Sequence, residues 1–227
     1  VIDFYGETLV DFDYDFDEYY ARVVSEDGQE EWTSLVCSLT VRETSFFRDP
    51  DAFRLVRDEL TRRFSVERRE EKRIVHLWSV GCSSGEEAYS LAMAALQALG
   101  YVGTCDIDLR VSGSDISETA LQDAALGVYD SRSVQKVTQL EKNRWFRKES
   151  GRFAVTEDLK SLVNWFQWNV TDPESVPAVK ADVIFCQNIL IYFRSDIRKK
   201  ILDSLVQRLT DNGILVVGSG EVTDWQH

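Results

Sequence analysis

Residues 78–90 of the 227-residue chain read Trp-Ser-Val-Gly-Cys-Ser-Ser-Gly-Glu-Glu-Ala-Tyr-Ser. They include the end of an apolar run, Ile74 to Val80, which predicts a buried strand because it is rich in β-branched residues. A helical pattern follows, with apolar residues at three- and four-residue spacing: Ala88, Leu91, Ala92, Ala95, Leu96 and Leu99. The order is strand, glycine-rich turn and helix, which is where an open α/β sheet binds a nucleotide-like ligand.

The glycine spacing in this turn narrows the class of ligand. Gly81 and Gly85 allow the backbone to turn tightly and approach a ligand, and Ser84 is a candidate N-cap for the helix. The turn is neither the lysine-bearing phosphate loop nor the dinucleotide G-x-G-x-x-G motif. Two carboxylates, Glu86 and Glu87, occupy the first helical turn instead. They either complement the helix dipole or bind a cationic ligand, for which a sulfonium with a free amino group is the obvious candidate.

Further strands and helices alternate after the turn, which implies a parallel sheet with right-handed crossovers. Ser195 to Leu209 predicts an amphipathic helix closed by Asn212-Gly213. The four strands expected after the first are Ile107 to Gly113, Leu162 to Val170, Ala181 to Cys186, and Ile214 to Gly218. The fold class is therefore α/β, with a mostly parallel, Rossmann-like sheet.

Asp115 follows the second expected strand directly. An acid at this position can accept hydrogen bonds from both hydroxyls of a ribose, or it can cap the helix that starts near Ser117. We assign ribose binding to Asp115 and helix capping to Ser117.

The net charge of −13 is concentrated at the start of the chain, where residues 1–31 hold eleven acids against one base, Arg22. A nucleic acid is therefore not expected as a partner, because phosphate binding needs a basic face. The same residues carry seven aromatic rings, which a purely solvated tail would not. We expect this acidic head to pack on the body or to bind a partner. A lid over the basic helix around Arg57, Arg62 and Arg63 is the alternative.

The rest of the amino-terminal region is expected to be helical. A short helix or linker is expected from Trp32 to Arg42, and a helix starting at Pro50 buries Phe53, Val56, Leu60 and Phe64. We therefore divide the chain into residues 1–65, the acidic head and helical region, and residues 66–227, the ligand-binding domain. Within the latter, Ser150-Gly151 between aromatic arms predicts a β-hairpin appendage near residues 140–156.

The cysteines and the hydropathy pattern indicate a cytoplasmic protein. The four cysteines, at positions 37, 82, 105 and 186, show no metal-ligand spacing, so reduced thiols and no metal are expected. No apolar run is long enough to span a bilayer, and no signal peptide is visible. The chain begins without Met and ends just after an expected strand, which is typical of a fragment.

Four motifs in this order resemble the CheR-type chemotaxis methyltransferases, which esterify glutamates of chemoreceptors with S-adenosylmethionine. They are Thr44-Ser45-Phe46-Phe47-Arg48-Asp49, the run Gly81 to Ser90, Gly113-Ser114-Asp115-Ile116, and Asn188-Ile189-Leu190-Ile191-Tyr192-Phe193. The resemblance covers most of the chain from about Leu35 onward. It implies a class I methyltransferase fold, S-adenosylmethionine as cofactor, S-adenosylhomocysteine as product, and a bacterial chemoreceptor or related signalling protein as partner.

The resemblance also implies roles for single residues. Arg48 and Tyr192 match residues near the transferred methyl group. Cofactor contacts are implied for Thr44 and Arg48 at the methionine end, Gly81 in the loop, Glu86 or Glu87 at the amino group, Asp115 at the ribose, Asn169 and Val170 at the adenine, and Asn188 along the pocket. Phe46, Phe47 and Phe193 are expected in the core. Arg42, Gln187 and Ala88 depart from the family pattern, where Asn, Arg and Pro are usual.

Methyl transfer to a glutamate side chain needs no general base, because that carboxylate, with a reference pKa of about 4.3, is already ionised at neutral pH. The absence of a catalytic His or Cys pair in the sequence is consistent with this reaction. We therefore predict a protein-glutamate O-methyltransferase. The alternatives are a methyltransferase acting on a small acid and a cofactor-binding regulatory domain of a larger signalling protein.

Overall fold

The computed structural model describes residues 16–40, 43–66, 73–102, 107–175, 180–222 and 225. The chain forms two compact units, Val1–Thr40 and Val41–His227. The first unit contains α1 (Phe16–Val23), a 3₁₀ turn η1 (Glu26–Gly28) and α2 (Gln29–Leu39). Within it the Tyr19 hydroxyl donates to Glu31 Oε1 at 2.7 Å. The part of the acidic head before Phe16 lies outside the described residues, as do Arg42 and Cys105.

A five-stranded sheet forms the centre of the second unit. Its strand order is β6-β2-β1-β7-β8, and every pair in it is parallel. The bounds are β1 (Arg73–Val80), β2 (Ile107–Asp115), β6 (Val163–Gln167), β7 (Ala181–Cys186) and β8 (Leu209–Val217). The predicted α/β class with a parallel sheet is confirmed. Because all five strands run the same way, their carboxyl ends meet at one edge of the sheet.

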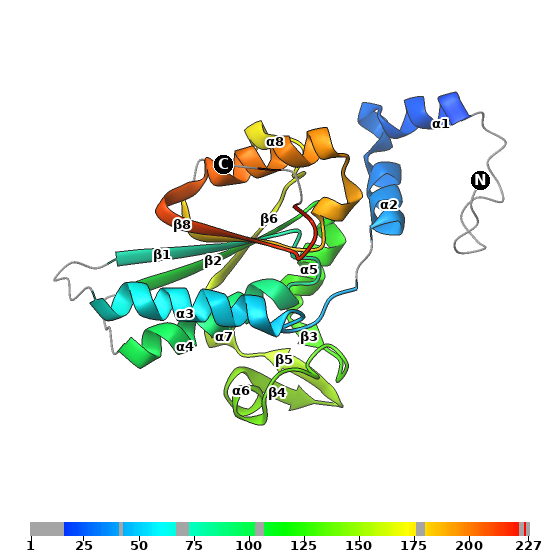
Figure 1. Cartoon of the computed structure of the whole chain (residues 1–227). Helices are drawn as coiled ribbons and strands as arrows, with labels where there is room; N and C mark the ends of the chain where they lie inside the picture. The colour runs from blue at the N-terminus through cyan, green and yellow to red at the C-terminus, as the bar shows by residue number, and fades with distance from the viewer. Residues whose placement is uncertain are drawn as a thin grey trace. The chain divides into compact units, whose positions relative to one another are not determined.

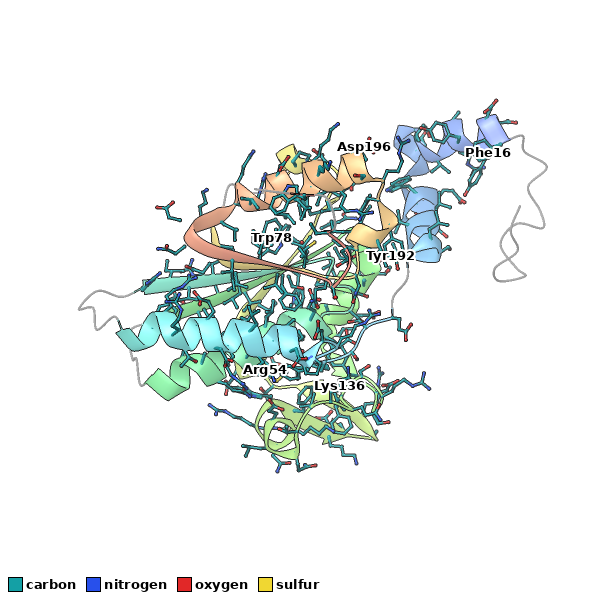
Figure 2. All side chains as sticks on the ribbon, in the orientation of Figure 1. Phe16, Arg54, Trp78, Lys136, Tyr192 and Asp196 are labelled. Carbon is teal, nitrogen blue, oxygen red and sulfur yellow. The ribbon has the colours of Figure 1, made fainter. Side chains whose placement is uncertain are left out.

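Helices cover both faces of the sheet, with α3 and α4 on one side and α8 on the other (Figure 1). The bounds are α3 (Pro50–Val66), α4 (Glu86–Val102), α5 (Glu118–Leu126) and α8 (Ser195–Val206). The predicted apolar face of α3 is buried as expected, and each such side chain contributes about 1.5–3 kcal/mol. Trp78 lies on the opposite face, in the cluster that packs under α8 (Figure 2).

A small β appendage lies below α3 and α4 in Figure 1 and confirms the predicted hairpin. It is a three-stranded sheet in the order β3-β5-β4. Thr138 opens its helix with a capping box that it forms with Glu141. The bounds are β3 (Val128–Tyr129), α6 (Gln139–Trp145), β4 (Phe146–Glu149), β5 (Arg152–Val155) and α7 (Glu157–Lys160). Two 3₁₀ turns, η2 (Pro173–Ser175) and η3 (Leu190–Tyr192), complete the unit.

Two local expectations about helix ends were wrong. Asn212-Gly213 does not close α8, which ends at Val206; it lies inside β8, where the pairing with β7 shifts between Ala181 and Val183. A turn signal within a strand commonly marks such an irregularity. Ser84 does not cap α4 either, because the carbonyl of Gly85 accepts the first helical bond, from Tyr89 N at 3.0 Å.

One arginine of the basic helix is buried. Arg63 is only 9% exposed, and its Nη1 donates to Asp182 Oδ1 at 3.4 Å. Arg62 pairs with Glu59. The side chains of Arg57 and Arg62 remain 43% and 71% exposed, so the lid over this helix stays a prediction. Division of the chain at residue 65 stays a prediction: the compact units meet after Thr40, and α3 belongs to the second unit. Among the described residues, no helix is long and apolar enough to cross a bilayer.

Candidate functional site

The glycine-rich loop between β1 and α4 is fixed to the end of β2. The backbone N–H groups of Gly81 and Cys82 both donate to the Ser114 carbonyl, at 2.8 and 2.9 Å. Gly81 has φ +71°, and a Cβ on it would lie 2.5 Å from Ile189 Cγ2. Gly85 has φ +93°, and a Cβ there would lie 2.7 Å from that of Ala124. Both positions therefore need glycine for conformation and for space.

Asp115 ties this loop to the next helix. Its Oδ2 accepts from Ser83 N at 2.8 Å and its Oδ1 from Ser117 N at 2.9 Å. The Ser117 side chain accepts from Ala120 N at 3.3 Å, so the predicted N-cap of α5 is confirmed. A carboxylate can accept several hydrogen bonds at once, which is the property that binding of ligand hydroxyls requires.

The two glutamates of α4 have different surroundings. Ser79 Oγ donates to Glu87 Oε1 at 2.7 Å. Burial raises the pKa of Glu87 to about 8; the Ser79 bond and the charge of Arg48 oppose this rise, while the charges of Glu221 and Asp115 add to it. These charges come from separate segments of the chain, so Glu87 lies where those segments meet.

Glu86 belongs to another environment. It is only 3% exposed, and its Oε2 accepts from Ser84 Oγ at 2.8 Å. Burial raises its pKa, bonds from Ser84 and Ser133 lower it, and the charge of Asp130 raises it. Asp130 and Ser133 directly follow β3, on the side of the appendage. Of the two carboxylates, Glu87 is therefore the one grouped with Asp115 and Arg48.

The segment from Glu43 to Asp49 is anchored to α4 and to the turn after β3. Phe47 N donates to Ser90 Oγ at 3.0 Å, and Phe46 N donates to the Ser133 carbonyl at 3.0 Å. Phe46 is fully buried, with edge-to-face contacts to Tyr129 and Phe146. Phe47 and Phe193 pack against the core while half-buried. The prediction of core packing is confirmed for these three rings.

Arg48 follows with its side chain exposed. The Arg48 Nη1 donates to the Glu43 carbonyl at 2.8 Å. The Arg48 carbonyl accepts from Lys136 Nζ at 2.5 Å. The guanidinium is therefore oriented by the main chain of its own segment, close enough for its charge to lower the pKa of Glu87. Thr44 is half-buried in the same segment.

The loop after β7 carries two predicted site residues. Asn188 has φ +62°, unusual for a residue other than glycine. Tyr192 ends η3 and is 60% exposed, beyond the carboxyl ends of the strands on the right of Figure 2. A buried carboxylate, Glu221, accepts from the backbone N–H groups of this loop. Sequence reasoning missed Glu221, although an acid in a glycine-rich turn after the last strand was a usable signal.

Asn169 and Val170 follow β6 and reach the same edge of the sheet. Trp168 N donates to the Asp115 carbonyl at 2.9 Å, which holds the start of this turn beside Asp115. Asn169 Oδ1 accepts from Thr171 N and Oγ1 at 3.0 and 2.8 Å. Val170 packs on the core cluster under α8. The structure thus brings Asn169 and Val170 to the Asp115 side of the sheet edge, and Arg48 to the Glu87 side.

The residues at this edge fit S-adenosylmethionine. Ser83 Oγ is buried and has no hydrogen-bond partner among the described residues, which leaves a polar atom for a ligand in the glycine loop. Glu87 is a carboxylate held in a poorly compensated site, which a cationic amino group would stabilise. Asp115 is a carboxylate, the group that suits the hydroxyls of a ribose.

Fold and site together define a class I, S-adenosylmethionine-dependent methyltransferase domain. Residues 42–227 match the family model described as "CheR methyltransferase, SAM binding domain", and the chain belongs to this family. The resemblance seen in four sequence motifs is confirmed. S-adenosylmethionine is therefore the cofactor and methyl transfer the reaction type.

Curated relatives agree with this assignment. "Chemotaxis protein methyltransferase 2" of Vibrio cholerae is 30% identical over 208 residues, which are 91% of this chain and 71% of that protein. "Chemotaxis protein methyltransferase 1" of the same organism is 32% identical over 188 residues, 82% of this chain and 66% of that protein. The Escherichia coli chemotaxis protein methyltransferase is 30% identical over 211 residues, 91% of this chain and 70% of that protein.

Proposed function

We propose that this protein transfers the methyl group of S-adenosylmethionine to glutamate side chains of a bacterial chemoreceptor or related signalling protein, in the cytoplasm. The products would be glutamate methyl esters and S-adenosylhomocysteine. The observation that carries the proposal is the family match over residues 42–227, together with relatives named as chemotaxis protein methyltransferases.

The residues at the site support transfer to an oxygen that is already ionised. S-adenosylmethionine supplies an electrophilic methyl group on a sulfonium. In the described part of the chain, Cys82 and Cys186 are buried and burial raises the pKa of each thiol well above its usual value, so neither is a ready nucleophile. His76 is bonded to Ser112 and to the Lys180 carbonyl, at the start of β7. A substrate carboxylate needs none of these groups as a base.

Arg48 and Tyr192 would act on the substrate. The exposed guanidinium of Arg48 can attract and orient a carboxylate through paired N–H donors. The Tyr192 hydroxyl can donate to the same carboxylate or limit its approach. Aligning the reacting oxygen with the methyl group is the main task left to the protein, and such positioning is worth about 7–11 kcal/mol.

The cofactor would lie along the carboxyl edge of the strands. Glu87, rather than Glu86, would receive its amino group, because Glu87 shares its surroundings with Asp115 and Arg48. Asp115 would accept from the ribose hydroxyls. The remaining contacts we assign are Thr44 and Arg48 at the methionine end, Gly81 in the loop, Asn169 and Val170 at the adenine, and Asn188 along the pocket.

The acidic head, residues 1–31, would be a docking segment for a partner or an appendage rather than a part of the site. Deletion of residues 1–31 should then leave methyl transfer unchanged at both low and high salt. Faster and less salt-sensitive transfer after deletion would instead make the head an inhibitory lid, since charges beyond about 10 Å are screened at 0.1 M salt.

The test is incubation with cofactor labelled in its methyl group and with candidate receptor cytoplasmic domains. The proposal predicts label on the receptor that is released by mild base, as methyl esters are, and that is lost when receptor glutamates are replaced by glutamine. The Arg48→Ala variant serves as the negative control. Tight cofactor binding with no labelled acidic protein would favour the regulatory-domain alternative, and labelling of small acids alone would favour the small-molecule alternative.

A further inference from the structure

We propose that Glu221 is a positioning residue for methyl transfer. From the turn after β8 it holds the loop after β7, which carries Asn188 and Tyr192, in the conformation that methyl transfer needs. The inference rests on the proposed function for its kinetic consequence. Its structural part, that one carboxylate organises this loop, stands on the contacts described next.

The Glu221 carboxylate accepts four backbone hydrogen bonds while only 2% of the residue is exposed. Oε1 accepts from Leu190 N at 2.9 Å and Ile191 N at 3.3 Å. Oε2 accepts from Asn188 N at 2.9 Å and Gly218 N at 2.8 Å. These N–H groups face a side chain rather than a helix or a strand partner. Without Glu221 the N–H groups of Leu190 and Gly218 would be buried donors with no acceptor, which is costly.

Gly218 shows that the space for this carboxylate is built in. A Cβ on Gly218 would lie 2.1 Å from Glu221 Oε2. A side chain at residue 218 would therefore expel the carboxylate from its place. Gly218, which follows β8, thus leaves room for the carboxylate of Glu221. Their spacing in the sequence does not predict that the carboxylate binds the loop after β7.

Arg198 closes the same loop from its other end. Its Nη1 donates to the Glu221 carbonyl at 2.8 Å and its Nη2 to the Phe193 carbonyl at 3.1 Å. The Glu221 side chain is thus hydrogen-bonded to the start of the loop. Its main-chain carbonyl is linked through Arg198 to Phe193, the residue after Tyr192. The loop is fixed at both ends to one point.

The loop so held also meets the glycine-rich turn. Ile189 Cγ2 occupies the space next to Gly81 where a Cβ would be. Asn188, before it, has a left-handed backbone, which a residue other than glycine keeps only where its surroundings hold it there. The bond from Asn188 N to Glu221 supplies such a constraint. A shift of this loop would therefore move Asn188 and Tyr192 relative to Gly81 together.

A carboxylate suits this place better than its amide. All four groups that meet the side chain are donors, so the NH₂ of a glutamine would face two of them without an acceptor. Bonds to a charged acceptor are also stronger than neutral ones. Glu221→Gln should accordingly disturb the loop while preserving the size of the side chain.

The experiment compares Glu221→Gln with Asp182→Asn in the full chain. Asp182 is a matched control because it is a buried carboxylate (4% exposed) at the start of β7, where it accepts from His76 N at 3.0 Å, away from the loop. We expect Glu221→Gln to lower kcat for receptor methylation by about tenfold to a hundredfold, the range that small misplacements reach. S-adenosylhomocysteine affinity should change by less than kcat does. Asp182→Asn should lower the melting temperature with little loss of kcat.

Two readouts keep the inference testable if no receptor is methylated. Amide hydrogen exchange at residues 188, 190, 191 and 218 should quicken in Glu221→Gln and not in Asp182→Asn. The pH dependence of S-adenosylhomocysteine binding should also move to lower pH, because Glu87 loses one of the negative charges around it while Asp115 and Arg48 remain. Unchanged exchange at these amides, or equal loss of kcat in both variants, would overturn the inference.

Discussion

Acidic side chains are buried at both ends of the parallel sheet, but they differ in how far nearby cations compensate them. At the amino end, Asp182 lies 3.4 Å from Arg63 and 3.8 Å from Arg73, and it also accepts from the main chain of β1. At the carboxyl end, burial raises the pKa of Glu87, the charges of Glu221 and Asp115 add to the rise, and the Ser79 hydrogen bond and the charge of Arg48 oppose it. The first arrangement is compensated by cations of the protein itself. The second is only partly compensated, so a cationic ligand group would stabilise the ionised form of Glu87.

This contrast separates an ion pair that stabilises the fold from a buried acid that lies where a ligand would bind. Removing one partner of the Asp182 cluster leaves an uncompensated buried charge and lowers stability. A cationic ligand group beside Glu87 would stabilise its ionised form, which burial disfavours in the free protein. Strongly perturbed acids at the ligand-binding edge of an α/β sheet are therefore better indicators of the site than the paired acid at the opposite edge.

The largest effect should come from Arg48, the cation of the carboxyl end. Arg48→Ala should slow receptor methylation on the order of 100-fold, the usual scale for removing a charged group that orients the reacting atoms. S-adenosylhomocysteine binding should change much less. Calorimetry and initial rates test this, with Arg54→Ala as control, because Arg54 is an exposed arginine of α3 paired with Asp51. A parallel loss of product affinity would make the cofactor contact of Arg48 its main role instead of its contact with the substrate.

Asp115→Ala should weaken S-adenosylhomocysteine binding by about 1.5–3 kcal/mol, the scale of hydrogen bonds to a charged group. The variant also removes the acceptor for Ser83 N and Ser117 N, so its melting temperature must be measured beside its affinity. A folded variant with unchanged affinity would remove Asp115 from the cofactor site and leave it as a tie between the loop and α5.

Gly81→Ala should lower stability by about 1–3 kcal/mol, because alanine is strained at positive φ and its Cβ would meet Ile189. Urea denaturation measures the change. Gly100→Ala in α4 is the matched control: a Cβ there meets nothing within 4 Å, so alanine should be neutral or stabilising by about 0.5–1 kcal/mol. An equal free energy of unfolding in the two variants would mean that Gly81 does not pack closely against Ile189 in the segment after β7.

Another effect concerns pH. Folding raises the pKa of Glu87 from 4.5 to about 8, so between these values the folded protein keeps a proton that the unfolded chain has released. The free energy of unfolding contributed by this group therefore falls as pH rises from about 4.5 to about 8 and is level above that. Glu87→Gln should remove this slope, whereas Glu157→Gln, an exposed acid of α7, should keep it. Urea denaturation from pH 5 to pH 9 compares the three proteins.

Local sequence predicted the parts of this molecule that depend on neighbours in the chain. The strand, glycine turn and helix around Gly81, the cap at Ser117 and the apolar face of α3 all follow from spacing and residue type. Three features required contacts between distant segments. They are the difference between Glu86 and Glu87, the ion pair of Arg63 with Asp182, and the hold of Glu221 on the loop after β7, whose partners are about 30 residues away in sequence.

Cofactor binding at this edge of the sheet depends most on Glu87, as the acceptor for a cationic group of the cofactor. The most direct measurement is calorimetric titration with S-adenosylhomocysteine of the wild type, Glu87→Gln and Glu86→Gln at pH 8. Glu87→Gln should weaken binding on the order of tenfold to a hundredfold, as loss of a charged hydrogen-bond acceptor does, and Glu86→Gln should bind nearly as the wild type does. Strong loss in Glu86→Gln with intact binding in Glu87→Gln would contradict the account.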